Sequence, residues 1–195
     1  AKESVAIVAS SDALLYGGLV ASRTHEIPLP TLEARAERLV QLKRAHSGQK
    51  VYVFATIMRS PKASSAPVEP EYYAEWGSQI FRMGALEDKL ELKEIKRSEV
   101  RELADLRAKI PQEVQQDLYA RRADNIRATE LLLHGVESGD FDYMLIGRDD
   151  TAAYSQAHRE ARNMDILVRE LPRERIRFFA GADQLGLLLL SRAAT

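Results

Sequence analysis

The feature that most constrains the fold is a short apolar stretch that runs directly into charged residues. Residues 143–146 have the length and composition of a buried strand, and Arg148, Asp149 and Asp150 follow almost at once. The pattern predicts a helix from Thr151 onward, with an acidic side chain placed to accept its first free backbone N–H groups. In open or barrel-shaped α/β folds, ligands bind beyond the carboxyl ends of the strands. The stretch therefore predicts a site where a buried strand ends.

Three other segments follow the same plan. Residues 5–9, 51–58 and 176–180 are apolar runs, and each is followed by polar residues and then by helical periodicity. Strands that alternate with helices predict an α/β fold with a mainly parallel sheet of about four strands flanked by helices, either Rossmann-like or a partial barrel. A chain of 195 residues suits one α/β domain, residues 1–195.

A helical excursion is predicted within this domain at residues 86–138. Its first half alternates Glu with Lys and Arg around spaced apolar residues, as a solvated helical face does. Pro111 breaks the pattern, and a second long helix follows. Two consecutive helices before the next strand suggest a cap over the site or a contact between two copies of the chain, and the sequence does not choose between them.

The composition limits the kinds of partner that the chain is expected to bind. Apolar residues make up 45% of the chain and charged residues 29%, which is ordinary for a globular domain, and the net charge of -1 gives no reason to expect nucleic acid. No run reaches the roughly 18 apolar residues of a spanning helix, so no membrane span is predicted. Cys is absent and no HExxH motif occurs, so a zinc site is not expected. Cytoplasmic and exported locations both remain open.

Polar residues at the ends of the strands form the predicted site. Parallel strands lie about 4.8 Å apart, so the ends of four neighbouring strands fall within roughly 15 Å. The residues predicted to be catalytic are Asp149, Asp150 and Asp183. Those predicted to bind a ligand are Asp12, Tyr16, Gly17, Arg23, Arg59, Arg148 and Tyr154. Helix capping is the alternative role for each acid taken singly, because Asp is a favoured N-cap residue.

Clustered carboxylates repel one another, so they need a cation, a shared proton or a basic neighbour. If a metal binds, Mg²⁺, Mn²⁺ or Ca²⁺ is expected, with Asp12, Asp149 and Asp183 as ligands. His158 is expected at a surface or interface rather than as a base. Three functions follow in order of preference: a hydrolase-like enzyme for a carbohydrate-like or phosphorylated small molecule, a non-catalytic sugar-binding domain, and an interaction scaffold.

Three motifs resemble a bacterial family of uncharacterised proteins, domain of unknown function 4127. They are YGGLVASR at residues 16–23, GRDD at 147–150 and GADQLGLLL at 181–189. The family often has Gln before its acidic pair and Pro before its Tyr, whereas Arg148 and Ala153 stand here. Family members look longer, with an amino-terminal Asp-Asp-Arg-Pro motif. The resemblance therefore implies a fragment, whose expected partner is a second copy in a homodimer or the missing amino-terminal region of the same chain, and it implies no activity.

Overall fold

The sheet consists of four parallel strands. The computed structural model describes residues 5–195. The strands are β1 (Ala6–Ser10), β2 (Lys50–Ile57), β3 (Tyr143–Arg148) and β4 (Ile176–Ala180), and they lie side by side in the order β1-β2-β3-β4. All three pairings are parallel. The predicted α/β fold with a parallel sheet of four strands is confirmed. Because the strands follow one another in chain order, the described sheet has no reversal of the kind that marks a switch point.

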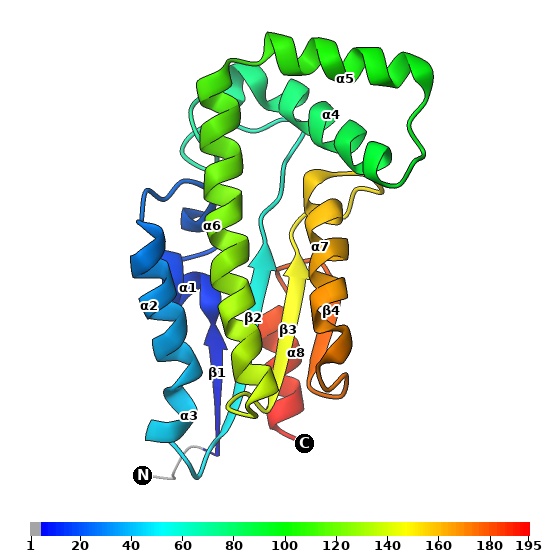
Figure 1. The fold of residues 1–195 in the computed structure, drawn as a ribbon. Coiled ribbons are helices and arrows are strands. Elements are labelled where there is room, and N and C mark those ends of the chain that lie inside the picture. Colours follow the sequence, from blue (N-terminus) through cyan, green and yellow to red (C-terminus); the bar gives the residue numbers. More distant parts are fainter. Residues whose placement is uncertain (1–4) are drawn as a thin grey trace.

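Helices pack on both faces of the sheet (Figure 1). One face carries α1 (Ser11–Tyr16), α2 (Leu29–Val40), the second half of α6 (Gln112–Glu137) and α7 (Gln156–Leu167); the other carries α8 (Leu185–Ala193). The alternation of side chains along β2 explains both layers. Val51, Val53, Ala55 and Ile57 belong to the larger core beneath α2, α6 and α7, whereas Tyr52 and Phe54 point into the smaller core beneath α8.

Gly147 allows α8 to approach the sheet. A Cβ atom at this position would lie 2.4 Å from Leu185 Cδ1 and 2.5 Å from the carbonyl oxygen of Gly181. Any larger residue would push α8 or the chain after β4 away from β3. The glycine that ends the apolar run in the sequence is therefore a packing residue of the second layer.

A second, smaller core lies beyond the carboxyl ends of the strands. α4 (Tyr73–Glu91) and α5 (Arg97–Lys109) stand across this edge of the sheet, and we call them the helical cap (Figure 1). They pack on the start of α6 through eight buried residues: Tyr73, Ile80, Met83, Leu86, Leu103, Ile110, Val114 and Leu118. α6 then runs back along the sheet, where Ala128, Leu132 and Val136 join the larger core. The predicted excursion, residues 86–138, thus contains both cap helix and sheet-covering helix.

The remaining elements are short. They are α3 (Leu42–Ala45) and two 3-10 helices, η1 (Ala21–Arg23) and η2 (Val168–Glu170). Within residues 5–195, none of the helices is both long enough and apolar enough to cross a membrane.

Candidate functional site

Five charged residues meet at the carboxyl edge of the sheet, and we call them the strand-end cluster. Arg23, in η1, is its centre: Nη2 donates to Asp149 Oδ2 at 2.6 Å, and Nη1 lies 3.5 Å from Glu69 Oε1. Arg59, just after β2, donates from Nε to the same Glu69 oxygen at 2.8 Å. Asp12 completes the cluster, in the first turn of α1. The cluster therefore joins the ends of β1, β2 and β3.

Among the carboxyl groups of the strand-end cluster, that of Asp12 has the most strongly shifted pKa. Its side chain is only 3% exposed, and this burial raises the pKa of the carboxyl from 3.8 to about 7. The side chain of Thr56 opposes the shift, and the negative charge of Asp149 adds to it. At neutral pH, Asp12 is thus able both to hold and to release a proton, while Asp149 is charge-paired with Arg23.

Glu69 ties the long loop between β2 and α4 to this edge. Its side chain is 2% exposed, and burial raises the pKa of its carboxyl against the opposing effect of Arg59 and Arg23. Asp149 is more accessible, with 13% of its side chain exposed, and Arg59 retains 30%. A ligand reaching the cluster would therefore meet Asp149 and Arg59 first and Asp12 behind them.

Serines, rather than the acids, cap the helices that follow β1 and β3. Ser10 Oγ accepts from the Ala13 N–H at the start of α1, and Ser155 Oγ accepts from the His158 N–H at the start of α7. The prediction of a helix from Thr151 is therefore wrong, because α7 begins at Gln156 under the Ser155 cap. Asp150 Oδ1 instead accepts from the Ala152 N–H within the preceding loop.

Among the described residues, Asp183 makes no hydrogen bond or ion pair with the strand-end cluster that would include it there. Asp183 lies after β4, is exposed, and makes no ion pair within residues 5–195. In the same part of the chain, no group of three or more His, Asp or Glu residues is arranged to hold a metal ion. Asp12, Asp149 and Asp183 thus form no such group in the part of the chain that the structure describes, and metal binding by them stays a prediction.

Three other predicted residues have structural contacts. Tyr16 is buried and stacks on His25 with ring centroids 4.9 Å apart, and burial raises the pKa of its hydroxyl. Gly17 adopts a left-handed conformation, with φ of 100°, that ends α1. Tyr154 donates from its hydroxyl to Glu94 Oε2 at 2.6 Å, which links it to the helical cap. Their roles in ligand binding stay predictions.

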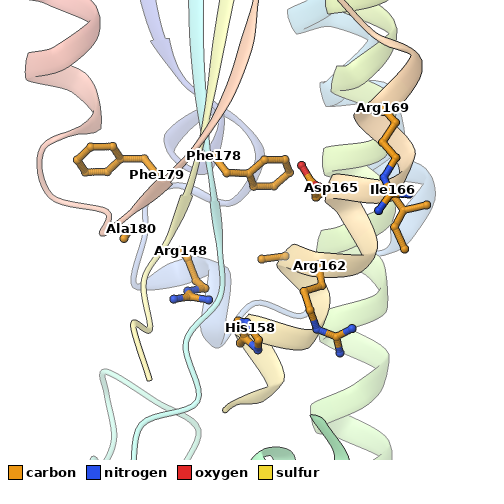
Figure 2. Close-up of a pocket in the computed structure, with 10 residues that line it drawn as sticks. Arg148, His158, Arg162, Asp165, Ile166, Arg169, Phe178, Phe179 and Ala180 are labelled. Atoms are coloured by element: carbon orange, nitrogen blue, oxygen red, sulfur yellow. The ribbon is translucent and has the colours of Figure 1, made fainter. Parts of the chain in front are cut away.

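Arg148 lines a cavity of about 460 Å³ between β4 and α7 (Figure 2). We call this the basic cavity. Its lining comprises Arg148, His158, Ala161, Arg162, Asp165, Ile166, Arg169, Phe178, Phe179 and Ala180. Successive residues at the end of β3 thus serve two places: Arg148 the basic cavity and Asp149 the strand-end cluster.

A buried carboxylate from the helical cap fixes His158 in this cavity. Asp88 on α4 is fully buried, and its Oδ2 lies 2.5 Å from His158 Nδ1. Arg162 Nη2 donates to Oδ1 at 2.8 Å, and the Ser155 N–H donates to Oδ2 at 3.2 Å. A carboxylate among such donors only accepts, so Nδ1 carries the hydrogen. Sequence reasoning missed Asp88, which lies 70 residues before His158 in a segment that reads as a solvated helix.

A buried arginine supports the end of β2. Arg122 on α6 is fully buried, donates to both carboxylate oxygens of Glu160 at 2.7 Å, and donates to the Met58 carbonyl at 2.6 Å. Its Nη1 also donates to the Arg59 carbonyl at 3.1 Å and to Ser60 Oγ at 3.0 Å. These bonds hold the backbone that carries Arg59. Its place in the middle of a charged helix gave no signal of burial.

The comparison with protein families agrees with the resemblance seen in the motifs. The family described as "Protein of unknown function (DUF4127)" matches residues 1–195, the whole chain. The chain belongs to the DUF4127 family. No curated protein and no solved structure matches it. Membership of the DUF4127 family assigns no activity to this chain.

Proposed function

We propose that this DUF4127 chain is a hydrolase-like enzyme with its acid–base site in the strand-end cluster. The observation that supports the proposal is the pairing of two unlike carboxyl groups. Asp12 has a pKa of about 7 because it is buried, whereas Asp149 is held by the Arg23 guanidinium at 2.6 Å. A buried carboxyl group with a pKa near neutrality can carry the proton, and a carboxyl group in an ion pair can act beside it.

The proposed chemistry is bond cleavage assisted by proton transfer. Asp12 would give a proton to the leaving oxygen, since a group with a pKa near the working pH is the most effective general acid. Asp149 would attack the reacting carbon or phosphorus as the protonated leaving group departs, and water would then cleave the covalent intermediate; alternatively, Asp149 would stabilise positive charge while water attacks directly. Arg59 would bind a hydroxyl or phosphate oxygen. The substrate class is a carbohydrate-like or phosphorylated small molecule, which suits carboxylates and guanidinium groups placed together.

The test is a pH profile of turnover. Wild-type protein would be assayed from pH 5 to 9 with p-nitrophenyl glycosides and with p-nitrophenyl phosphate. We expect kcat/KM for one of the two classes to fall through an inflection near pH 7, as Asp12 loses its proton. Asp12→Asn should lower kcat by about 10²–10⁴-fold and remove the inflection.

Asp105→Asn is the matched control, because Asp105 is an exposed residue of α5 outside the site. It should retain the wild-type rate and profile. Absence of turnover for both substrate classes would contradict the proposal, and so would an Asp12→Asn variant as active as wild type. The alternative, a non-catalytic sugar-binding domain or interaction scaffold, would then be favoured.

A further inference from the structure

The basic cavity contains an arginine with no partner. Within residues 5–195, the Arg148 side chain makes no hydrogen bond or ion pair, and its Nε is shielded from solvent. A buried N–H without an acceptor costs about 1–3 kcal/mol, so such groups in native proteins call for an explanation. The proposed acid–base reaction does not use Arg148. An anion bound in the cavity would supply a partner for the charge of the Arg148 guanidinium.

Two further basic side chains, those of His158 and Arg162, line the same cavity. His158 gives Nδ1 to Asp88, which leaves Nε2 without a partner in the described chain and open to solvent. Arg162 gives Nη2 to Asp88 and Glu91, while its Nε is buried and unpartnered. Asp88 thus orients both side chains through one nitrogen of each. This is how a fixed donor set for an oxyanion is built.

The charge of the lining is positive. Arg148, Arg162, Arg169 and His158 contribute four basic side chains, and Asp165 is the one acid among the lining residues. Asp165 is paired with Arg173 at 3.1 Å, outside the lining. Arg148 and Arg169 have no ion pair in the part of the chain that the structure describes. The cavity therefore has unneutralised positive charge, which favours an anion.

One wall is apolar. Phe178 on β4 points toward α7, whereas Phe179 points away from it toward α8 (Figure 2). Ala161 and Ile166 from α7 complete the wall beside Phe178. The volume of about 460 Å³ falls within the roughly 300–1,000 Å³ of typical small-molecule sites. The space thus fits a ring or short chain as well as the charged group.

From this arrangement we infer that the basic cavity binds a small molecule with a phosphate or carboxylate group attached to an apolar, ring-sized body. The oxyanion accepts from the Arg148 guanidinium, and from His158 Nε2 when the imidazole carries a hydrogen on both nitrogens, while the apolar body lies against Phe178. The site is separate from the acid pair of Asp12 and Asp149. It goes beyond the proposed hydrolysis, and it stands or falls independently of it.

The test is calorimetric titration of the intact chain with phenyl phosphate, benzoate and benzyl alcohol. We expect at least one of the two anions to bind and the neutral alcohol to bind at least tenfold more weakly. A preference for phenyl phosphate or for benzoate identifies which oxyanion the donor set fits. Absence of binding by both anions up to millimolar concentration would overturn the inference, and so would equal binding of the alcohol.

Two variants locate the binding. Arg148→Gln should weaken binding of the anion at least tenfold, and its melting temperature without ligand should not fall below the wild-type value because Arg148 makes no side-chain bond. Ala161→Phe should fill the cavity and abolish binding without removing a charge. Arg101→Gln, on the exposed surface of α5, makes the same change of charge as Arg148→Gln and should bind as wild type. Wild-type affinity in Arg148→Gln, or an equal loss in Arg101→Gln, would refute the site.

Discussion

The raised pKa of Asp12 predicts how the stability of the protein depends on pH. The pKa of this carboxyl is about 7 in the folded chain and 3.8 in the reference state of an unperturbed side chain. Between these two values the folded protein keeps a proton that the unfolded chain has lost, so stability falls as pH rises. The contribution is fully present below pH 3.8 and is lost by the time pH exceeds 7.

The magnitude follows from the two pKa values. One pKa unit corresponds to 1.36 kcal/mol, so the complete loss is about 4 kcal/mol. Between pH 5 and pH 8 the same relation gives a loss of about 3 kcal/mol. Asp12→Asn removes the titration while keeping the size of the side chain. The stability of wild type relative to Asp12→Asn should therefore decline by about 3 kcal/mol over this range.

The assay is urea unfolding of both proteins at pH 5, 6, 7 and 8, followed by circular dichroism. Subtracting the two free energies of unfolding cancels the titration of groups common to both, including Glu69. A difference that stays constant with pH would refute the reasoning, because it would mean that Asp12 has the same pKa in the folded and unfolded chains. A wild type that gains stability relative to the variant as pH rises would refute even the direction.

Two further predictions concern packing and buried charge. Gly147→Ala should destabilise the protein by about 1–3 kcal/mol, since its Cβ would lie 2.4 Å from Leu185 Cδ1; Gly48→Ala, with open space around it, is the control in a thermal melt. Arg122→Met should cost about 3–5 kcal/mol in urea unfolding, because the Glu160 carboxylate loses its charged partner and two backbone carbonyls lose their Arg122 donor. A double-mutant cycle with Glu160→Gln should show coupling, and additive effects would contradict the pairing.

The sheet was predictable because its signals are local. Each strand is a continuous apolar run, and a helix after each strand leaves few ways to bring the next strand alongside except in parallel. The gathering of Asp12, Arg23 and Asp149 follows from that topology, since parallel strands end at one edge. The start of α7 was mislocated because acids and Ser155 compete as caps in the same stretch, and the choice depends on the course of the loop.

The basic cavity was not predictable, because its geometry depends on contacts between distant segments. Asp88 comes from a helix whose charged residues alternate as on a solvated face, yet it is buried against α7. In the sequence, no motif around His158 marks it as part of a site. Its orientation comes from the contact with Asp88. Glu69 likewise lies in a loop whose composition predicts a solvent-exposed connector, but its side chain is buried in contact with Arg23 and Arg59.

The Asp88 carboxylate couples the position of the helical cap to the orientation of His158. Its bonds to Ser155, His158 and Arg162 are between 2.5 and 3.2 Å long, so a shift of α4 by a few ångströms would break all three together. A ligand that binds His158 and Arg162 would therefore also stabilise the helical cap in its present position. By thermodynamic reciprocity, a neighbouring domain or a second molecule that stabilises the helical cap in this position would raise the affinity for that ligand by the same factor.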